Sequence, residues 1–412
     1  MMAKAKFIIL LSICLFYGKY AFSQQGWIHK NLGTGNLVSI NFISTQTGYI
    51  FRSDKYLFKT TTSGASWDSS LINAQGLGIR QGCFITENHG AFMPVPGITT
   101  NGGSSWNQGS IPSVGGFYPQ NIYMHNDSTA FLSGVDLGNF VPYIFKTTNA
   151  GLNWYQVFAG GGANNYADIT FINDSTGFQC RFTILKTTDN GSSWFTLSHT
   201  SRQRTKFSKV FGDTMYLASA NGYVAKSINL GANWTENFTG INQLLTDIHF
   251  IDNQLGFAIG DSGGIVKTTN GGSNWIIQNS GTNKKLNELW FINKDTGFIA
   301  GDSGLLLVTY NGGVTSLSQN YQSTPEKFQL HQNFPNPFNP STIIRFDLVQ
   351  SGYTRLSIYD VSGKKITVLV DANLSPGSYE YNFNAENLPS GVYFYKIESE
   401  AFTETKRMIL IK

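Results

Sequence analysis

The sequence contains few charged residues, little cysteine and no set of residues spaced like metal ligands. Charged residues make up 13% of the 412 positions, about half of the roughly 25% that an average soluble domain carries. The net charge of +4 is small and dispersed, which argues against a nucleic-acid partner. Cys83 and Cys180 fall in sequence repeats that are not neighbours, so we expect no disulfide between them. The six histidines show no metal-ligand spacing, and we expect neither a metal nor another cofactor.

The N-terminus has the order of a secretory signal peptide. Two lysines precede an apolar run from Phe7 to Tyr17, and small residues follow it up to Ser23. We therefore predict a signal peptide over residues 1–23. The run is too short for a transmembrane helix, and no later stretch is long and apolar enough to span a bilayer. A lipoprotein signal ending at Cys14 is the alternative, but an isoleucine stands where a small residue is required.

A short phrase recurs about every forty residues between Lys59 and Ser316: TTSGASW, TTNGGSSW, TTNAGLNW, TTDNGSSW, SINLGANW, TTNGGSNW and TYNGGVTS. Repetition at this period, with one glycine-rich turn and usually one tryptophan per unit, indicates a β-propeller. Each unit can be divided into four strands. In the fourth unit we predict strands at Ile169 to Ile172, Gly177 to Arg181 and Thr183 to Thr187, and a fourth strand from Trp194. The same frame predicts first strands at Val38 to Ile43, Ile248 to Ile251 and Leu289 to Ile292.

The recurring turn lies between the third and fourth strands and has the form T-x-[DN]-x-G-x-x-W. Its short polar side chain can hydrogen-bond the backbone of the turn, and the glycine that follows permits a positive φ. The tryptophan is expected to pack between blades, so these residues have a structural role. The polar positions are Asn101, Asn149, Asp189, Asn229, Asn270 and Asn311, and the tryptophans are Trp67, Trp106, Trp154, Trp194, Trp234 and Trp275.

The seventh turn has Ser316 where a tryptophan should stand, and the N-terminus can supply the missing element. Trp27 precedes Ile40 of its first strand by thirteen residues, close to the fourteen residues between Trp275 and Leu289. We therefore predict that Trp27 to Leu32 form the outer strand of the seventh blade and close the ring without a free sheet edge. The expected fold is an all-β, seven-bladed propeller over residues 24–316.

The turns resemble Asp-boxes, also called bacterial neuraminidase repeats, and the array is similar to propellers of the photosystem II assembly factor type. The resemblance implies a propeller of seven or six blades. Sialidases share the turn, but in them Asp-boxes lie on the face away from the active site, so no catalytic residue carries over. Only Asp189 keeps an acidic residue at the third position of the turn.

The sequence suggests two enzyme activities, that of a serine protease and that of a sialidase, but other residues argue against both. The segment GDSGG, Gly260 to Gly264, matches the nucleophile segment of trypsin-like proteases, but GDSG recurs one repeat later at Gly301 to Gly304. We interpret both as hairpin turns. A sialidase needs an arginine cluster and a tyrosine activated by a glutamate, and the propeller region has only five arginines.

Lysines precede the turn in five of the seven repeats. They could form a basic ring for a polyanion, but we favour solvated strand ends without a binding role. The residues are Lys59, Lys146, Lys186, Lys226 and Lys267.

The third repeat departs from the pattern and therefore offers the best binding site that the sequence shows. Its second hairpin is enlarged over Ser133 to Tyr143, and the connections on either side are long and aromatic. All three are expected on the face opposite the turns. The candidate ligand surface consists of Phe117, Tyr118, Asp136, Phe140 and Tyr166, and a weaker basic candidate on the same face includes His199, Arg202, Arg204 and Lys206. Ordinary loop packing is the alternative for these residues.

The repeat stops after Ser316, and residues 317–327 are interpreted as a polar linker. Residues 328–412 contain NFPNPFNPSTIIRFDL, LSIYDVSGK, LPSGVYFYKI and KRMILIK, and the alternating apolar strands among them predict a small immunoglobulin-like β-sandwich. These motifs, in this order, resemble the type A C-terminal sorting domain of the type IX secretion system. The resemblance implies passage through the periplasm and across the outer membrane, usually followed by removal of the domain and release or surface attachment of the cargo. A plain accessory domain is the alternative.

From these observations we expect a monomeric, non-enzymatic propeller at the outer-membrane surface or in the medium that binds an extracellular glycan or protein. A glycoside hydrolase or lyase is the first alternative, with Asp136, Asp168 and Glu87 as the first carboxylates to consider. An assembly-factor-like, protein-binding propeller is the second. Two carboxylates facing each other across a deep pocket would favour an enzyme, whereas a shallow aromatic surface would favour binding.

Overall fold

The computed structural model describes residues 26–412 except 74–75, 77, 113–114, 161–167, 181–182, 200–203, 208–211, 314–316, 321–324, 351, 375, 387 and 400–401. The predicted signal peptide lies outside these residues. The described residues divide into two compact units, a larger one that ends before Ser316 and a smaller one within Ser316–Lys412. Among the described residues, no helix has the length and hydrophobicity needed to cross a membrane.

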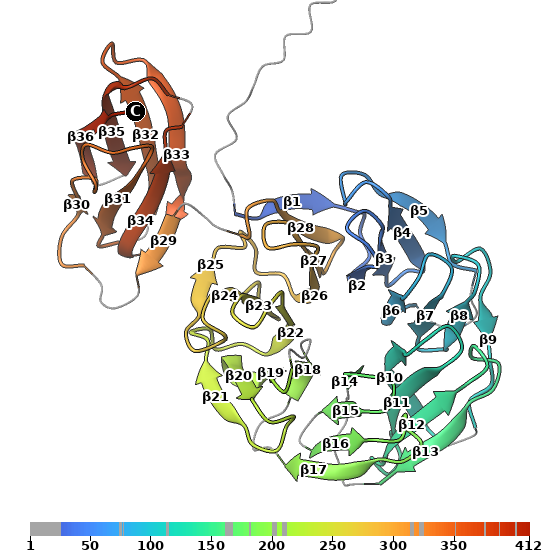
Figure 1. The fold of residues 1–412 in the computed structure, drawn as a ribbon. Coiled ribbons are helices and arrows are strands. Elements are labelled where there is room, and N and C mark those ends of the chain that lie inside the picture. The colour runs from blue at the N-terminus through green and yellow to red at the C-terminus, as the bar shows by residue number, and fades with distance from the viewer. Residues whose placement is uncertain are drawn as a thin grey trace, which may run out of the picture. The chain divides into compact units, whose positions relative to one another are not determined.

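The larger unit contains, in its described residues, seven antiparallel sheets of four strands each, and Figure 1 shows them following one another around a ring. Six sheets are built from four consecutive strands. The innermost strands are β2 (Leu37–Phe42), β6 (Gln81–Phe84), β10 (Phe117–Met124), β14 (Asp168–Phe171), β18 (Arg204–Phe207), β22 (Leu245–Phe250) and β26 (Leu286–Phe291). The second strands are β3 (Gly48–Arg52), β7 (Gly90–Met93), β11 (Ala130–Asp136), β15 (Gly177–Cys180), β19 (Met215–Ser219), β23 (Gly256–Gly260) and β27 (Gly297–Gly301).

The third strands of these sheets are β4 (Tyr56–Thr60), β8 (Gly97–Thr99), β12 (Pro142–Thr147), β16 (Thr183–Thr187), β20 (Tyr223–Ser227), β24 (Ile265–Thr268) and β28 (Leu305–Thr309). The outer strands are β5 (Asp68–Leu71), β9 (Asn107–Gln108), β13 (Tyr155–Ala159), β17 (Phe195–His199), β21 (Thr235–Phe238), β25 (Ile276–Gln278) and β1 (Ile28–Asn31), and one short 3-10 helix, η1 (Ala220–Gly222), joins β19 to β20. The first strands and the fourth repeat predicted from the sequence agree with these bounds within three residues. Both GDSG segments form hairpin turns, between β23 and β24 and between β27 and β28.

The seventh sheet joins the two ends of the repeat array. β1 pairs antiparallel with β28, from Ile28 opposite Val308 to Asn31 opposite Leu305. The Trp27 side chain is 3% exposed, and its Nε1–H donates to Oε1 of Gln278 over 2.9 Å. The outer strand of this sheet thus comes from the N-terminal end of the array and the other three strands from its C-terminal end, with β1 over Ile28–Asn31 inside the segment Trp27 to Leu32.

Stacked aromatic rings hold neighbouring sheets together. A ring at the start of a second strand stacks on a phenylalanine of the next innermost strand. In three of the five cases a glycine precedes this ring (Gly48, Gly256 and Gly297) and leaves room for a second ring. At Gly48, for example, a Cβ atom would lie 2.6 Å from the Phe42 ring. The stacked pairs and their centroid separations are Tyr49–Phe84 (3.8 Å), Phe131–Phe171 (4.9 Å), Tyr216–Phe250 (3.6 Å), Phe257–Phe291 (4.1 Å) and Phe298–Phe42 (4.9 Å).

The smaller unit contains two four-stranded sheets around one apolar core that includes Ile344, Phe346, Leu356 and Tyr395. In one sheet the order is β29 (Leu317–Asn320), β34 (Gly377–Asn384), β31 (Ser341–Leu348) and β30 (Gln329–Leu330). In the other it is β33 (Lys365–Leu374), β32 (Gly352–Asp360), β35 (Gly391–Ser399) and β36 (Phe402–Leu410). The first residues of the interpreted linker differ from that expectation, because β29 pairs with β34 and so belongs to this unit.

Candidate functional site

The enlargement of the third repeat lengthens the strands of its sheet, so residues predicted for a loop surface lie within strands. Phe117 and Tyr118 lie in β10, where Phe117 pairs with Asp136 at the end of β11. The Phe117 ring is half-buried against Phe145, 4.9 Å between centroids. Asp136 is 6% exposed and accepts the backbone N–H two residues later over 2.8 Å. The Arg80 guanidinium covers the Tyr118 ring at 4.2 Å, so three of the five predicted residues are used in local packing.

The other predicted site residues are less well defined. Phe140 is 48% exposed and has a positive φ of 58° in the turn between β11 and β12. Tyr166 and Arg202 lie outside the described residues, and Arg204 is described only as part of β18. Of the five residues predicted for the aromatic surface, the structure describes Phe117, Tyr118, Asp136 and Phe140.

The recurring turns on the opposite face have their polar side chains fully used. In the fourth repeat, Asp189 Oδ1 accepts the Thr187 hydroxyl over 2.8 Å and the Ser193 backbone N–H over 2.9 Å, while the Gly191 N–H donates to Thr187 Oγ1. Hydrogen bonds from Ser193 hold the pKa of Asp189 down at about 2. The same contacts recur around Asn101, Asn149, Asn229 and Asn270, and Thr62 takes this position in the first repeat. The tryptophans pack between sheets, as Trp194 does against Phe131 and Phe171.

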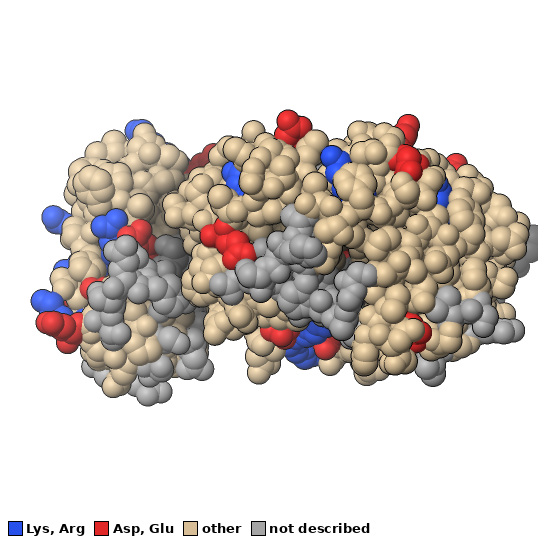
Figure 2. Space-filling model, turned by 90° about the horizontal axis from the view of Figure 1, so that it is seen from below, with Lys and Arg blue, Asp and Glu red and all other residues tan. Residues whose placement is uncertain are grey.

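The lysines before the turns link neighbouring blades. Nζ of Lys146 donates to the Asn190 carbonyl over 2.6 Å, and Lys226 and Lys267 make the equivalent bonds to Gly271 and Gly312. Each of the five lysines also lies over an aromatic ring of its own sheet. The ammonium groups of Lys146, Lys226 and Lys267 already donate to the next turn, so fewer of their N–H groups remain to bind a polyanion. On the face drawn in Figure 2, charged side chains of both signs lie among a majority of uncharged ones.

A cluster of ionisable side chains lies instead at the centre of the ring. A cavity of about 720 Å³ is lined by all seven innermost strands. Along these strands burial alternates: in β26, for example, Glu288 and Trp290 are partly exposed, whereas Leu289 and Phe291 are buried. Since alternate side chains of a strand point to opposite sides, every second residue faces the cavity.

Seven polar residues, one from each innermost strand, form a ring that we call the inner belt. Each occupies the same position in its repeat, directly before a buried residue of the innermost strand. Five of them accept a backbone N–H of the following innermost strand: Asp168 Oδ2, for example, accepts the Phe207 N–H over 2.9 Å, and Asp247 Oδ2 accepts the Leu289 N–H over 2.8 Å. The other two, Asn121 and Lys206, donate to carboxylates of the belt. The inner belt consists of Ser39, Gln81, Asn121, Asp168, Lys206, Asp247 and Glu288.

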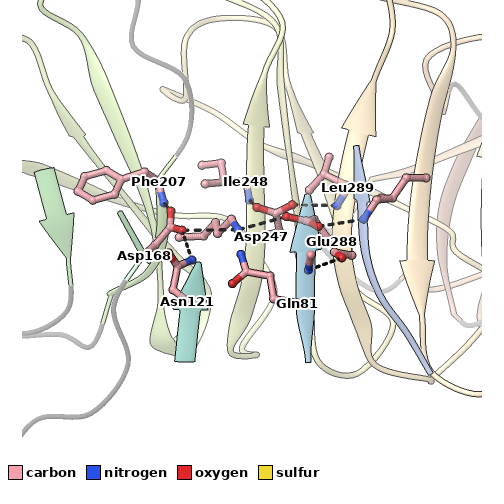
Figure 3. Close-up of polar contacts among 12 residues, drawn as sticks. Gln81, Asn121, Asp168, Phe207, Asp247, Ile248, Glu288 and Leu289 are labelled. Atoms are coloured by element: carbon pink, nitrogen blue, oxygen red, sulfur yellow. Dashed lines mark hydrogen bonds and ion pairs between the residues drawn. The ribbon is translucent and has the colours of Figure 1, made fainter. Parts of the chain in front are cut away.

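Four members of the inner belt are ionisable, and Figure 3 shows the carboxylates converging from three strands. Nζ of Lys206 lies 3.2 Å from Glu288 Oε1 and 3.6 Å from Asp168 Oδ1. Glu288 Oε2 accepts the Ile40 N–H over 2.9 Å, which links the last innermost strand to the first. Asp247 Oδ1 accepts its neighbour's N–H, that of Ile248, over 2.8 Å.

Burial and charge shift the acidity of this cluster. Burial raises the pKa of Asp247 to about 8, and Glu288 adds to the rise against the opposing effect of Lys206 and two backbone N–H groups. Burial lowers the pKa of Lys206, but the carboxylates of Asp168, Glu288 and Asp247 outweigh it and hold that pKa well above its usual range. Lys206 is therefore a charged ammonium at neutral pH.

The walls beside the inner belt are aromatic and aliphatic. Two residues further along the strands stand Tyr123, His249 and Trp290, and the His249 and Trp290 rings are 5.4 Å apart. Isoleucines follow after another two residues, as at Ile251 and Ile292. The cavity thus combines a charged ring with apolar walls, the usual composition of a ligand site. Among the described residues, no group of three or more histidine, cysteine, aspartate or glutamate side chains could hold a metal ion.

Of the three carboxylates that line the cavity, only Asp168 was among those suggested by the sequence; Asp247 and Glu288 were not. Asp168 lines the cavity, whereas Glu87 is exposed in the turn after β6 and Asp136 lies at the end of β11. The first strands were predicted to begin at the apolar residues Ile248 and Leu289, one position after the polar residues of the belt. A polar residue at that position in every repeat was the available signal.

Two family models match two different parts of the chain. Residues 332–412 match the family model described as a secretion system C-terminal sorting domain. Residues 225–329 match the model described as photosynthesis system II assembly factor YCF48. No curated protein matches the chain.

Solved structures show the fold of the larger unit. A structure of YCF48 bound to a D1 peptide is 19% identical with a TM-score of 0.56, and the match covers 69% of this chain and 95% of that one. YCF48 from Cyanidioschyzon merolae is 16% identical with a TM-score of 0.54, covering 69% and 98%. The WD40 β-propeller domain of Doa1 is 8% identical with a TM-score of 0.54, covering 69% and 96%. The chain is thus an all-β protein whose larger unit has a propeller fold like that of these structures, and the two family models mark the stretches where it is similar to a photosystem II assembly factor and to a C-terminal sorting domain.

Proposed function

We propose that this chain is an exported, seven-bladed propeller that binds an extracellular polypeptide or glycan in its central cavity without reacting with it. A signal peptide over residues 1–23 starts export. An immunoglobulin-like sandwich over residues 328–412 then directs the propeller through the type IX secretion system to the cell surface or the medium. The sorting-domain match supports this route.

The observation that carries the binding role is the use of every carboxylate oxygen in the inner belt. Both oxygens of Asp247 accept backbone N–H groups, Asp168 accepts a backbone N–H and the Asn121 amide, and Glu288 holds the Ile40 N–H and Lys206. A carboxylate oxygen that already holds a structural hydrogen bond is a weaker base and a weaker nucleophile than a free one, although it can still accept a further hydrogen bond from a ligand. These carboxylates fix neighbouring blades to one another, which gives a rigid rim for binding.

A glycoside hydrolase or lyase is the second candidate. Three carboxylates line the cavity, and two carboxylates facing each other across a deep pocket are the arrangement that we expected for an enzyme. The raised pKa of Asp247 also suits a general acid. Loss of turnover in a variant that still binds the ligand would favour this candidate.

The likeness to YCF48 makes a polypeptide ligand the first to test. One YCF48 structure contains a bound D1 peptide. An assembly-factor role for this chain would also require a polypeptide partner, so binding of a peptide in the cavity is compatible with both roles. The partner would then have to lie outside the cell or in the periplasm.

The test is a peptide and glycan array probed with the full chain, followed by a cleavage assay on every hit. Trp290→Ala removes an aromatic wall of the cavity and should abolish binding. Phe140→Ala changes the predicted loop surface and should leave binding intact. The reverse result would move the site to the enlarged third repeat.

Export is tested separately by deleting residues 328–412. We expect the shortened protein to accumulate in the periplasm, whereas the full chain reaches the surface or the medium. Unchanged surface delivery of the shortened protein would refute the sorting role.

A further inference from the structure

We propose that the central cavity is selective for a cation, and specifically for a primary ammonium group on an alkyl chain, such as a lysine side chain. The inference rests on the proposed function, because it names the chemistry of the group that the cavity would hold. It does not depend on whether that group belongs to a peptide or to another amine.

The first observation is the charge balance around the cavity. Three carboxylates, Asp168, Asp247 and Glu288, face one ammonium, that of Lys206. With all four ionised, the cluster carries a net charge of −2, and with Asp247 protonated it carries −1. In either state the cluster attracts a further cation and repels an anion.

The remaining titratable groups that line the cavity do not reverse this balance. Burial raises the pKa of the Cys83 thiol to about 11 and that of Tyr123 to about 12, so both are uncharged at neutral pH. His249 lies against the Trp290 ring on the same wall. With His249 neutral, the inner belt leaves the cavity with a net negative charge.

The second observation is independent of charge and concerns Asn121. This side chain is 6% exposed and lines the same cavity, and its Nδ2–H donates to Asp168 Oδ1 over 3.0 Å. Its Oδ1 atom accepts no hydrogen bond within the described part of the chain. A buried acceptor without a donor is unfavourable, and a ligand N–H group that reached it would remove that cost.

The cavity walls favour an alkyl chain behind the charged group. Tyr123 and Trp290 present aromatic rings, whose faces attract cations, and Ile251 and Ile292 offer aliphatic contacts beyond them. Part of the charged ring is open to the cavity, since the side chains of Glu288 and Lys206 are 18% and 23% exposed. An ammonium could thus reach Glu288 while its alkyl chain contacts the wall.

The test compares three probes of one length, n-hexylammonium, n-hexanol and hexanoate, by saturation-transfer NMR and calorimetry on the full chain near pH 7. We expect hexylammonium to bind at least about tenfold more tightly than hexanol, and hexanoate not to bind. Since a bound cation lowers the pKa of Asp247, binding should also release protons, which calorimetry in buffers of different ionisation enthalpy would detect. Preferential binding of hexanoate would overturn the inference.

Two variants sharpen the result. Lys206→Met removes the competing cation and should tighten hexylammonium binding by about tenfold, whereas an anion-selective site would lose hexanoate. Glu288→Gln removes one negative charge but keeps an oxygen for the Ile40 N–H, and should weaken hexylammonium binding by about tenfold. Unchanged affinity in both variants would also refute the inference.

The outcome separates this inference from the proposed function. If array ligands bind and Trp290→Ala abolishes their binding, but no hexyl probe binds, the cation selectivity is wrong and the binding role stands. If Trp290→Ala leaves every array ligand bound, the central cavity is not the site and both fail.

Discussion

Glu288 offers the sharpest test of whether the inner belt is structural. Its Oε2 accepts the Ile40 N–H across the junction where the two ends of the repeat array meet, and its Oε1 pairs with Lys206. Glu288→Ala leaves that N–H without an acceptor, which costs about 1–3 kcal/mol, and weakens the pairing of a largely buried ammonium. Because Asp168 still faces Lys206, we expect a total loss of about 2–4 kcal/mol in the free energy of unfolding. Glu288→Gln keeps an acceptor for Ile40 and should cost about 1 kcal/mol.

Urea denaturation followed by tryptophan fluorescence measures this difference. All eight tryptophans lie between Trp27 and Trp290, so their fluorescence reports on the larger unit alone, even in the full chain. The expected order of stability is wild type, then Glu288→Gln, then Glu288→Ala. Equal stability of the alanine variant and the wild type would show that Glu288 does not fasten the junction. The carboxylate would then be available for chemistry, and the hydrolase alternative would gain support.

Three further predictions concern other contacts of the larger unit. Because burial raises the pKa of Asp247 to about 8, the folded protein keeps a proton that the unfolded chain loses above about pH 4. The free energy of unfolding should therefore fall as pH rises from about 4 to 8. Measurement of Tm against pH should show this fall, and Asp247→Asn should flatten it. Trp27→Ala should cost about 3–5 kcal/mol by opening the ring closure, and Trp27→Phe clearly less, both measured in urea; an effect below about 1 kcal/mol would contradict the closure. Lys226→Met removes the bond to the Gly271 carbonyl and should cost about 1 kcal/mol without changing retention on heparin, whereas lost retention would revive the basic ring as a polyanion site.

The fold followed from the sequence because each repeat carries its own turn chemistry. A short polar side chain, a glycine and a tryptophan act locally, so their spacing predicts a hairpin in every unit, as the contacts around Asp189 illustrate. The closing strand was inferred from one interval, since Trp27 precedes its next strand by nearly the same number of residues as Trp275 does, and β1 pairs with β28. These features depend on residues close together in the chain.

The candidate site depends on contacts between residues far apart in sequence, and these were not predictable in the same way. Lys206 and Glu288 are 82 positions apart and meet only because the ring brings their strands together. Lys206 was assigned to a basic loop, since it follows two arginines in sequence. Phe117 and Tyr118 were assigned to a connection because glycines precede them, but pairing with the long strand β11 extends the sheet to include them.

The most direct test of the account is binding of the full chain and its Trp290→Ala variant to the same peptide and glycan array, with each hit assayed for cleavage. The account predicts at least one ligand that the full chain binds without cleaving and that the variant does not bind. Cleavage of the bound ligand, or equal binding by the variant, would contradict a non-enzymatic binding site in the central cavity.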